Sequence, residues 1–227
     1  MRQQPFLYEG TITKTVRLNS LLYLPPEYGD DTTTRLPLIL FLHGAGERGD
    51  DLNILNNHGI PRLLAQGRDL PFVIVSPQCP PNSEWSLHMD ALTALLDHML
   101  DTYRIDRERV YLTGLSMGGR GAWLWAALNT ERLAALAPIC GRRPDILRNP
   151  PQAARLKDLP IWVFHGAQDK IVPVEESLKM VEALEACGGK PRLTVYPDAG
   201  HDSWTRTYDN AELYEWFLRQ RRGGYQQ

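Results

Sequence analysis

The amino-acid sequence predicts an α/β fold, a mostly parallel central sheet with helices on both of its faces. Three observations lead to this prediction. Hydrophobic residues make up 43% and charged residues 23% of the chain, which is ordinary globular usage. Short, wholly apolar runs recur along the chain, as in strands that are covered on both faces. Amphipathic helical patterns alternate with these runs, which is typical of this class.

The expected strands are runs of three to seven apolar residues. They are Leu36–Leu42, Phe72–Val75, Val110–Leu112, Leu133–Ile139, Ile161–Phe164 and Leu193–Tyr196. Before them, residues 10–24 contain alternating polar and apolar side chains, so we expect a half-exposed N-terminal strand or hairpin there.

The expected helices lie between the strands, where apolar residues recur every three or four positions. One pattern runs from Met89 to Tyr103, a second from Val174 to Leu184, and a third covers Leu213 to Phe217. A further helix is expected after residue 116, around Ala122 and Trp123.

The chain of 227 residues falls between one and two domains of typical size. No repeat or low-complexity tract is present, and the candidate linkers at residues 25–34 and 142–153 are too short to separate two domains. We therefore expect residues 1–227 to form a single domain without a large cap domain.

Charge and cysteine usage exclude several classes of protein. Lysine and arginine total 25 against 27 acidic residues, a net charge of −2, which argues against nucleic-acid binding. The longest apolar stretch has eight residues, whereas a membrane span needs about 20. The N-terminus shows no apolar signal core, and Cys79, Cys140 and Cys187 fit no zinc pattern. A cytoplasmic protein with reduced thiols is expected.

A serine between two glycines marks the candidate catalytic centre. Ser116 lies in Gly114-Leu115-Ser116-Met117-Gly118, directly after the expected strand at residues 110–112. A Gly-x-Ser-x-Gly at a strand-to-helix junction is the nucleophile-elbow pattern, in which a tight, strained turn lifts the hydroxyl group clear of the sheet.

A serine hydroxyl group needs a base, and the base needs an acid to hold it in one tautomer. In this pattern the acid and then the histidine follow the serine along the chain. His201, after the last expected strand, is the expected base, and His165 is expected to have a core or loop-anchoring role. Asp169, after the preceding strand, is the expected acid, whereas Asp198 and Asp202 suit turn or capping roles.

The reaction also needs donors for the developing oxyanion. We expect one to be the backbone N–H of Met117, at the start of the helix after the elbow. The other is expected from the loop His43-Gly44-Ala45-Gly46, most plausibly from Ala45.

The sequence of the same loop, from Gly44 to Gly49, also matches the dinucleotide-binding pattern G-x-G-x-x-G. That pattern requires an acid at the end of the next strand, about 20 residues on. Asp69 has the right spacing but precedes its strand, at Phe72–Val75. We therefore do not expect nucleotide binding.

Together these motifs resemble those of the α/β-hydrolase superfamily, from about residue 20 to residue 221. The stretches Leu42-His43-Gly44-Ala45-Gly46-Glu47-Arg48-Gly49, Ser76-Pro77-Gln78-Cys79-Pro80, His165-Gly166-x-x-Asp169 and Gly200-His201 are similar to those of compact, lidless serine carboxylesterases. That subgroup is labelled phospholipase/carboxylesterase-like or predicted peptidase, and is related to feruloyl esterases. Arg142-Arg143 departs from its pattern. Dienelactone hydrolases resemble the same plan but with a cysteine nucleophile, and Ser116 argues against them.

The expected function is hydrolysis of small-molecule carboxylic esters, with short acyl or aryl groups, through Ser116, His201 and Asp169. No metal or organic cofactor is expected. Trp85 and Trp204 are expected either to wall the substrate pocket or to be packing aromatics, and Arg142 either to bind a substrate carboxylate or to be solvated. A peptidase, an acyltransferase and a non-catalytic binding protein stay open as alternatives, and the sequence does not give the oligomeric state.

Overall fold

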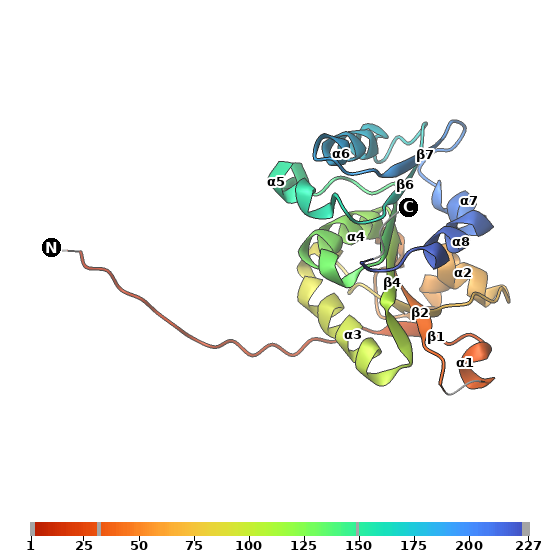
Figure 1. Cartoon of the computed structure of the whole chain (residues 1–227), viewed down its shortest axis with the longest axis horizontal. Coiled ribbons are helices and arrows are strands. Elements are labelled where there is room, and N and C mark those ends of the chain that lie inside the picture. Colours follow the sequence, from red (N-terminus) through yellow and green to blue (C-terminus); the bar gives the residue numbers. More distant parts are fainter. Residues whose placement is uncertain (1–2, 31–32, 149, 224–227) are drawn as a thin grey trace.

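The computed structural model describes residues 3–30, 33–148 and 150–223 (Figure 1). Within these residues seven strands form one sheet in the order β1-β3-β2-β4-β5-β6-β7. The strands are β1 (Ser20–Tyr23), β2 (Leu36–Leu42), β3 (Val73–Pro77), β4 (Ile105–Leu115), β5 (Ala135–Ile139), β6 (Trp162–Gly166) and β7 (Arg192–Tyr196). β1 pairs antiparallel with β3, and every other pairing in the sheet is parallel. The predicted fold class is confirmed.

The predicted N-terminal strand is wrong over most of its length. Only Ser20–Tyr23 joins the sheet, and residues 3–19 are assigned to no helix or strand. The N-terminal part of this segment leaves the body of the molecule (Figure 1), whereas Leu18 packs against the core and Lys14 forms an ion pair with Asp90. A strand needs a partner for its backbone groups, and the neighbouring strand β3 pairs only with residues 20–23. Alternation alone therefore indicates a strand only where a partner strand is within reach.

Helices cover both faces of the sheet. On one face lie α3 (Met89–Thr102), α4 (Met117–Leu128), α5 (Pro150–Ala153) and α6 (Glu175–Ala186), and on the other lie α2 (Gly59–Ala65), α7 (Trp204–Asp209) and α8 (Ala211–Arg219) (Figure 1). The short helix α1 (Glu27–Asp30) follows β1. The predicted patterns at residues 89–103, 174–184 and 213–217 coincide with α3, α6 and α8.

Each central strand contributes to two hydrophobic layers because successive side chains point to opposite faces. In β2, Leu38, Leu40 and Leu42 belong to the same hydrophobic cluster as residues of α3, α4 and α6, whereas Ile39 and Phe41 belong to the cluster that includes residues of α2, α7 and α8. All five side chains are buried. This burial on both faces explains why the strands are unbroken runs of apolar residues in the sequence.

Parallel strands end at one edge of the sheet, and the loops that follow them meet there. The loops after β2, β4, β6 and β7 carry the candidate site. Between β5 and β6 the described residues form only 3₁₀ turns at Asp145–Arg148 and Ala154–Leu156 and the one-turn helix α5. Among the described residues, no helix is long and apolar enough to cross a membrane.

Candidate active site

Ser116 stands in a strained turn between β4 and α4. Its φ angle is +53°, in the left-handed region that non-glycine residues rarely adopt. A Cβ atom at Gly114 would lie 2.5 Å from the carbonyl oxygen of Gly118, and one at Gly118 would lie 2.0 Å from that of Leu42. Both glycines are therefore required for the close approach of the elbow to strand β2.

The structure brings Ser116, His201 and Asp169 together in one chain of hydrogen bonds. His201 Nδ1 lies 2.7 Å from Asp169 Oδ2, and His201 Nε2 lies 2.9 Å from Ser116 Oγ. A carboxylate only accepts, so Nδ1 carries the proton and donates it to Asp169. Nε2 is then free to accept the hydroxyl proton of Ser116. This is the geometry that general-base activation of a serine requires.

Asp169 is buried, and its two carboxylate oxygens have separate partners. Oδ1 accepts hydrogen bonds from the backbone N–H groups of Ile171 and Val172, each at 2.9 Å, and Oδ2 accepts from His201. Burial alone would raise the pKa of this group, but the hydrogen bonds from His201, Val172 and Ile171 outweigh it, and the pKa of Asp169 is lowered. Asp169 is therefore an anion that can balance a protonated His201.

A close backbone approach helps to bring these residues together. A Cβ atom at Gly166, the last residue of β6, would lie 2.1 Å from the carbonyl oxygen of Gly200. The absence of a side chain at Gly166 lets the loop that carries His201 rest directly on the end of β6. The predicted turn role of Asp202 is confirmed, because its carboxylate accepts hydrogen bonds from the backbone N–H and hydroxyl groups of Thr205.

His165 is fully buried behind Asp169, as its predicted core role requires. Its Nε2 lies 3.2 Å from Asp169 Oδ2 and 2.9 Å from the carbonyl oxygen of Val172, and its Nδ1 lies 2.7 Å from Ser177 Oγ. The contact with the candidate acid was not predicted. The four-residue spacing in His165-Gly166-x-x-Asp169 is the signal that could have shown it.

The two expected oxyanion donors lie on segments that touch each other. Met117 is the first residue of α4, where backbone N–H groups lack helical partners. Ala45 begins a 3₁₀ turn, Ala45–Glu47, directly after β2. A Cβ atom at Gly44 would lie 2.7 Å from Cδ1 of Leu115, the residue before Ser116, so this loop rests against the elbow.

His43 orients the peptide unit that contains the Ala45 N–H. Its Nε2 accepts a hydrogen bond from the backbone N–H of Cys79 at 2.8 Å, so its proton is on Nδ1. Nδ1 then donates to the carbonyl oxygen of Gly44 at 2.6 Å. That carbonyl group and the N–H of Ala45 belong to the same peptide. Burial lowers the pKa of His43 to about 4, so the ring is neutral near pH 7.

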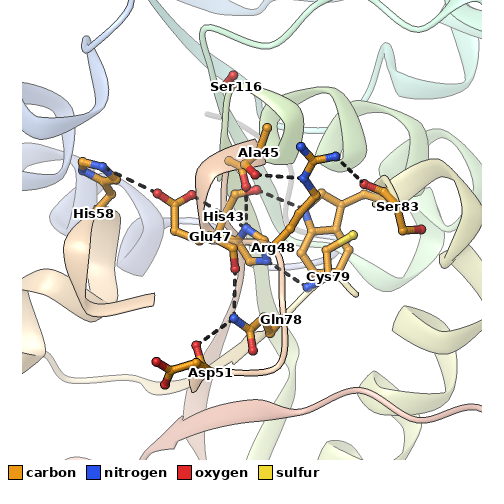
Figure 2. Close-up of polar contacts among 12 residues, drawn as sticks. His43, Ala45, Glu47, Arg48, Asp51, His58, Gln78, Cys79, Ser83 and Ser116 are labelled. Atoms are coloured by element: carbon orange, nitrogen blue, oxygen red, sulfur yellow. Dashed lines mark hydrogen bonds and ion pairs between the residues drawn. The ribbon is translucent and has the colours of Figure 1, made fainter. Parts of the chain in front are cut away.

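Further side chains fix the other carbonyl groups of this loop (Figure 2). Arg48 Nε donates to the carbonyl oxygen of Ala45 at 2.8 Å, and Gln78 Nε2 donates to those of Glu47 and Asp51. These supporting residues were not predicted. Gln78 lies on a separate loop from its partners, and Arg48 bonds a carbonyl group three residues away in its own loop. The motif around Glu47-Arg48 was visible in the sequence but suggested no role.

Trp85 does not wall a pocket. Its side chain is 1% exposed and packs on the His43 ring, and its Nε1 donates to the carbonyl oxygen of His43 at 3.0 Å. A Cβ atom at Gly121 of α4 would lie 2.6 Å from Trp85 Cβ, so the indole is held between this helix and the loop. The alternative of a packing aromatic is the one that the structure supports.

Trp204 lies beside the candidate base. Its ring meets that of His201 edge-on at 5.2 Å and that of His58 edge-on at 5.6 Å. His58 Nε2 lies 3.5 Å from Oε1 of the buried Glu47. Burial raises the pKa of the Glu47 carboxyl group, and the nearby His58 opposes this effect. Trp204 is half-buried, whereas Arg142 is exposed in the loop after β5.

Cys140, Asp169 and His201 form the group of side chains best placed to hold a metal ion among the described residues. Their potential ligand atoms lie within 4.8 Å of one another. However, Asp169 and His201 are only 2.7 Å apart and share a proton, whereas ligands of a tetrahedral zinc ion lie about 3.3 Å apart. This arrangement fits a hydrogen-bonded acid–base pair better than a metal centre.

The sequence profile of the dienelactone hydrolase family matches residues 82–214, more than half of the chain. The matched region contains Ser116, Asp169 and His201. The chain belongs to the dienelactone hydrolase family. The expectation that Ser116 sets it apart from these proteins is therefore wrong. The match extends over residues 82–214 and so does not rest on the identity of the nucleophile alone.

Relatives of this family member include a carboxymethylenebutenolidase homologue of Salmonella typhimurium, 37% identical over 100 residues. This match covers 42% of the chain and 37% of the relative, so the chain aligns with about two-fifths of its length. A bifunctional acetylxylan esterase/xylanase of Neocallimastix patriciarum is 30% identical over 189 residues, which are 79% of the chain and 26% of that protein.

Among solved structures, a thermostable esterase is 36% identical and superposes with a TM-score of 0.79, covering 91% of the chain and 60% of the esterase. Est1E of Butyrivibrio proteoclasticus, solved with ferulic acid, is 17% identical with a TM-score of 0.65, covering 89% and 95% of the two chains. At that identity the second likeness shows the fold alone.

Proposed function

We propose that this member of the dienelactone hydrolase family is a serine hydrolase that cleaves carboxylic esters. The observation that carries the proposal is the continuous hydrogen-bond chain from Ser116 Oγ through His201 to Asp169. Ser116 attacks the ester carbonyl carbon as His201 Nε2 takes its proton. The protonated His201 then donates that proton to the leaving alcohol, and an acyl-enzyme forms. Water, activated by His201, releases the acid.

The backbone N–H groups of Ala45 and Met117 bind the oxyanion in this proposal. The hydrogen bond from His43 to the Gly44 carbonyl group supports the role of Ala45, because it fixes the plane of the peptide that carries this N–H. Loss of one such donor typically costs about 2.7–4 kcal/mol of transition-state stabilisation. The chemistry needs neither a metal ion nor an organic cofactor.

The proposed substrates are small-molecule esters with short acyl or aryl groups. Support comes from the short segments between β5 and β6 and from the exposed position of Ala45, which together leave the site open. The acetylxylan esterase relative is named for a short acyl group, and the thermostable esterase for ester hydrolysis. Trp204 is the proposed aromatic wall, and Arg142 the proposed contact for an anionic substituent. A cytoplasmic location remains a prediction of the sequence.

A fluorophosphonate probe tests the serine nucleophile directly. We expect stoichiometric labelling of the wild-type protein at Ser116 and none in Ser116→Ala. The absence of labelling in the folded wild-type protein would support a non-catalytic binding protein instead.

A panel of p-nitrophenyl esters, thioesters and peptide anilides shows which kind of acyl bond the protein cleaves best. The proposal requires the highest kcat/KM on the oxygen esters. A higher value on the peptide anilides would make the protein a peptidase, and transfer of the acyl group to an added alcohol in preference to water would make it an acyltransferase.

A further inference from the structure

Asp169 has a partner in addition to those that a serine triad requires. Its Oδ2 lies 2.7 Å from His201 Nδ1 and also 3.2 Å from His165 Nε2. The side chains of His165 and Asp169 are both 0% exposed. Water therefore has no access to compete for this contact, and the two imidazole rings share one carboxylate oxygen.

The surroundings of His165 fix its tautomer. Its Nε2 faces two acceptors, Asp169 Oδ2 and the carbonyl oxygen of Val172 at 2.9 Å, so Nε2 carries a proton. In the neutral ring Nδ1 is then an acceptor, and it receives the hydroxyl proton of Ser177 at 2.7 Å. His165 belongs to β6 and Ser177 to the first turn of α6, so two rigid elements hold the ring in place.

We propose, on the basis of the proposed function, that His165 is a positioning residue that orients the Asp169 carboxylate toward His201, with Ser177 holding its tautomer. The bond to Val172 ties down the backbone of the Asp169 loop, and the bond to Oδ2 restricts rotation of the carboxylate. Because His165 shares Oδ2 with His201, it also limits how strongly Asp169 attracts the proton on His201 Nδ1.

Cys140, directly after β5, is a further ionisable group next to this cluster, as is Asp202, which follows His201 and accepts hydrogen bonds from Thr205. The Cys140 sulfur lies within 4.8 Å of the nearest ligand atoms of Asp169 and His201. Burial raises the pKa of Cys140 to about 12, so it is a neutral thiol at working pH. Changes at His165 therefore act on the Asp169–His201 pair without a competing charge at Cys140.

Three variants separate positioning from simple packing. His165→Leu removes the N–H group that donates to Asp169, and His165→Gln keeps an N–H group near the position of Nε2. Ser177→Ala removes the hydroxyl group that bonds His165 Nδ1 and so no longer favours one tautomer of the ring. Tyr214→Phe is the matched control, since it removes a different buried hydrogen bond, from Tyr214 to the carbonyl oxygen of Tyr208 at 2.8 Å. In His165→Leu we expect kcat to fall about tenfold to a hundredfold with KM within about twofold, and His165→Gln to recover most of the loss.

Two measurements are sensitive to the sharing of Asp169 Oδ2 between His165 and His201. In His165→Leu the acid limb of the kcat/KM–pH profile is expected to move to higher pH, and the NMR resonance of the His201 Nδ1 proton to lower field. Ser177→Ala is expected to give smaller shifts in the same directions, and Tyr214→Phe none. Variants that only lose stability, with neither readout moved, would overturn the inference. Because the resonance is measured without substrate, this result is distinct from a failure of the esterase proposal, in which the wild-type protein hydrolyses no ester.

Discussion

Asp169 decides which nitrogen of His201 carries the proton, and this choice makes Nε2 a base toward Ser116. Replacement of Asp169 by Asn puts an N–H donor within reach of His201 Nδ1 and favours the wrong tautomer. We expect kcat of Asp169→Asn to fall by about four orders of magnitude with the fold retained. Asp198→Asn, which breaks only the exposed ion pair with Arg206, is the control and should keep full activity. Comparable rates in the two variants would exclude Asp169 as the acid.

His43 gives the free energy of unfolding a pH dependence of known sign. Its pKa is about 4 in the folded protein, against 6.5 for a histidine side chain in water. Between these values the unfolded chain binds more protons, so stability is present above pH 6.5 and falls as the pH drops toward 4. The loss reaches about 3 kcal/mol.

Urea unfolding between pH 4.5 and 7 measures this dependence. His43→Gln should be less stable at pH 7 but should lack this part of the pH slope. His98→Gln, on the exposed side of α3, should keep the wild-type slope. Equal slopes in wild-type and His43→Gln would contradict the assignment of a neutral, buried His43.

At the scale of elements, the elbow depends on the closeness of α4 to β2. A Cβ atom at Gly118 would lie 2.0 Å from the carbonyl oxygen of Leu42 and 2.6 Å from that of His43. Both are backbone atoms, which cannot move away as the end of a flexible side chain could. We expect Gly118→Ala to lose several kcal/mol of stability and most of its activity. Gly29→Ala, with nothing within 4 Å of its new Cβ atom, should change neither. Thermal unfolding and esterase assays on the pair check this.

Strands could be predicted from the sequence where both of their faces are buried, because such strands are unbroken runs of apolar residues. The run at residues 36–42 coincides with β2 because both of its faces are covered. β4 is longer than its predicted apolar run because it also includes the polar residues 106–109, which lie at an irregularity between the pairings of Ile105 with Leu36 and of Val110 with Leu38. A strand was overpredicted at residues 10–19 because alternation does not reveal whether a partner strand exists.

The candidate triad could be predicted because its motifs follow the ends of strands. The hydrogen bonds that support it could not. His43 bonds Cys79, 36 residues away, and Gln78 bonds Glu47, 31 residues away. Such pairs depend on how loops at one sheet edge fold back on each other, and no local pattern encodes that. The position of Trp85 could not be predicted for the same reason, since it depends on contacts with both His43, in the loop after β2, and α4.

For the whole molecule, the short connection between β5 and β6 predicts an open cleft without a lid. An open cleft gives a long acyl chain little apolar surface to bury, so extra methylene groups add little binding energy. We expect kcat/KM on p-nitrophenyl esters to be highest for acetate and butyrate and to fall for longer chains. Emulsified long-chain esters should be poor substrates. A preference for long-chain lipid over p-nitrophenyl acetate would contradict the open cleft.

We propose that Ser116 carries the acyl group during turnover. Rapid mixing with p-nitrophenyl acetate, acid quenching within milliseconds and mass spectrometry of the digested protein test it most directly. We predict a burst of p-nitrophenol equal to the enzyme concentration and one acetyl group on the peptide that contains Ser116. An acetyl group found only on another residue, or a Ser116→Ala variant that turns over at the wild-type rate, would contradict the account.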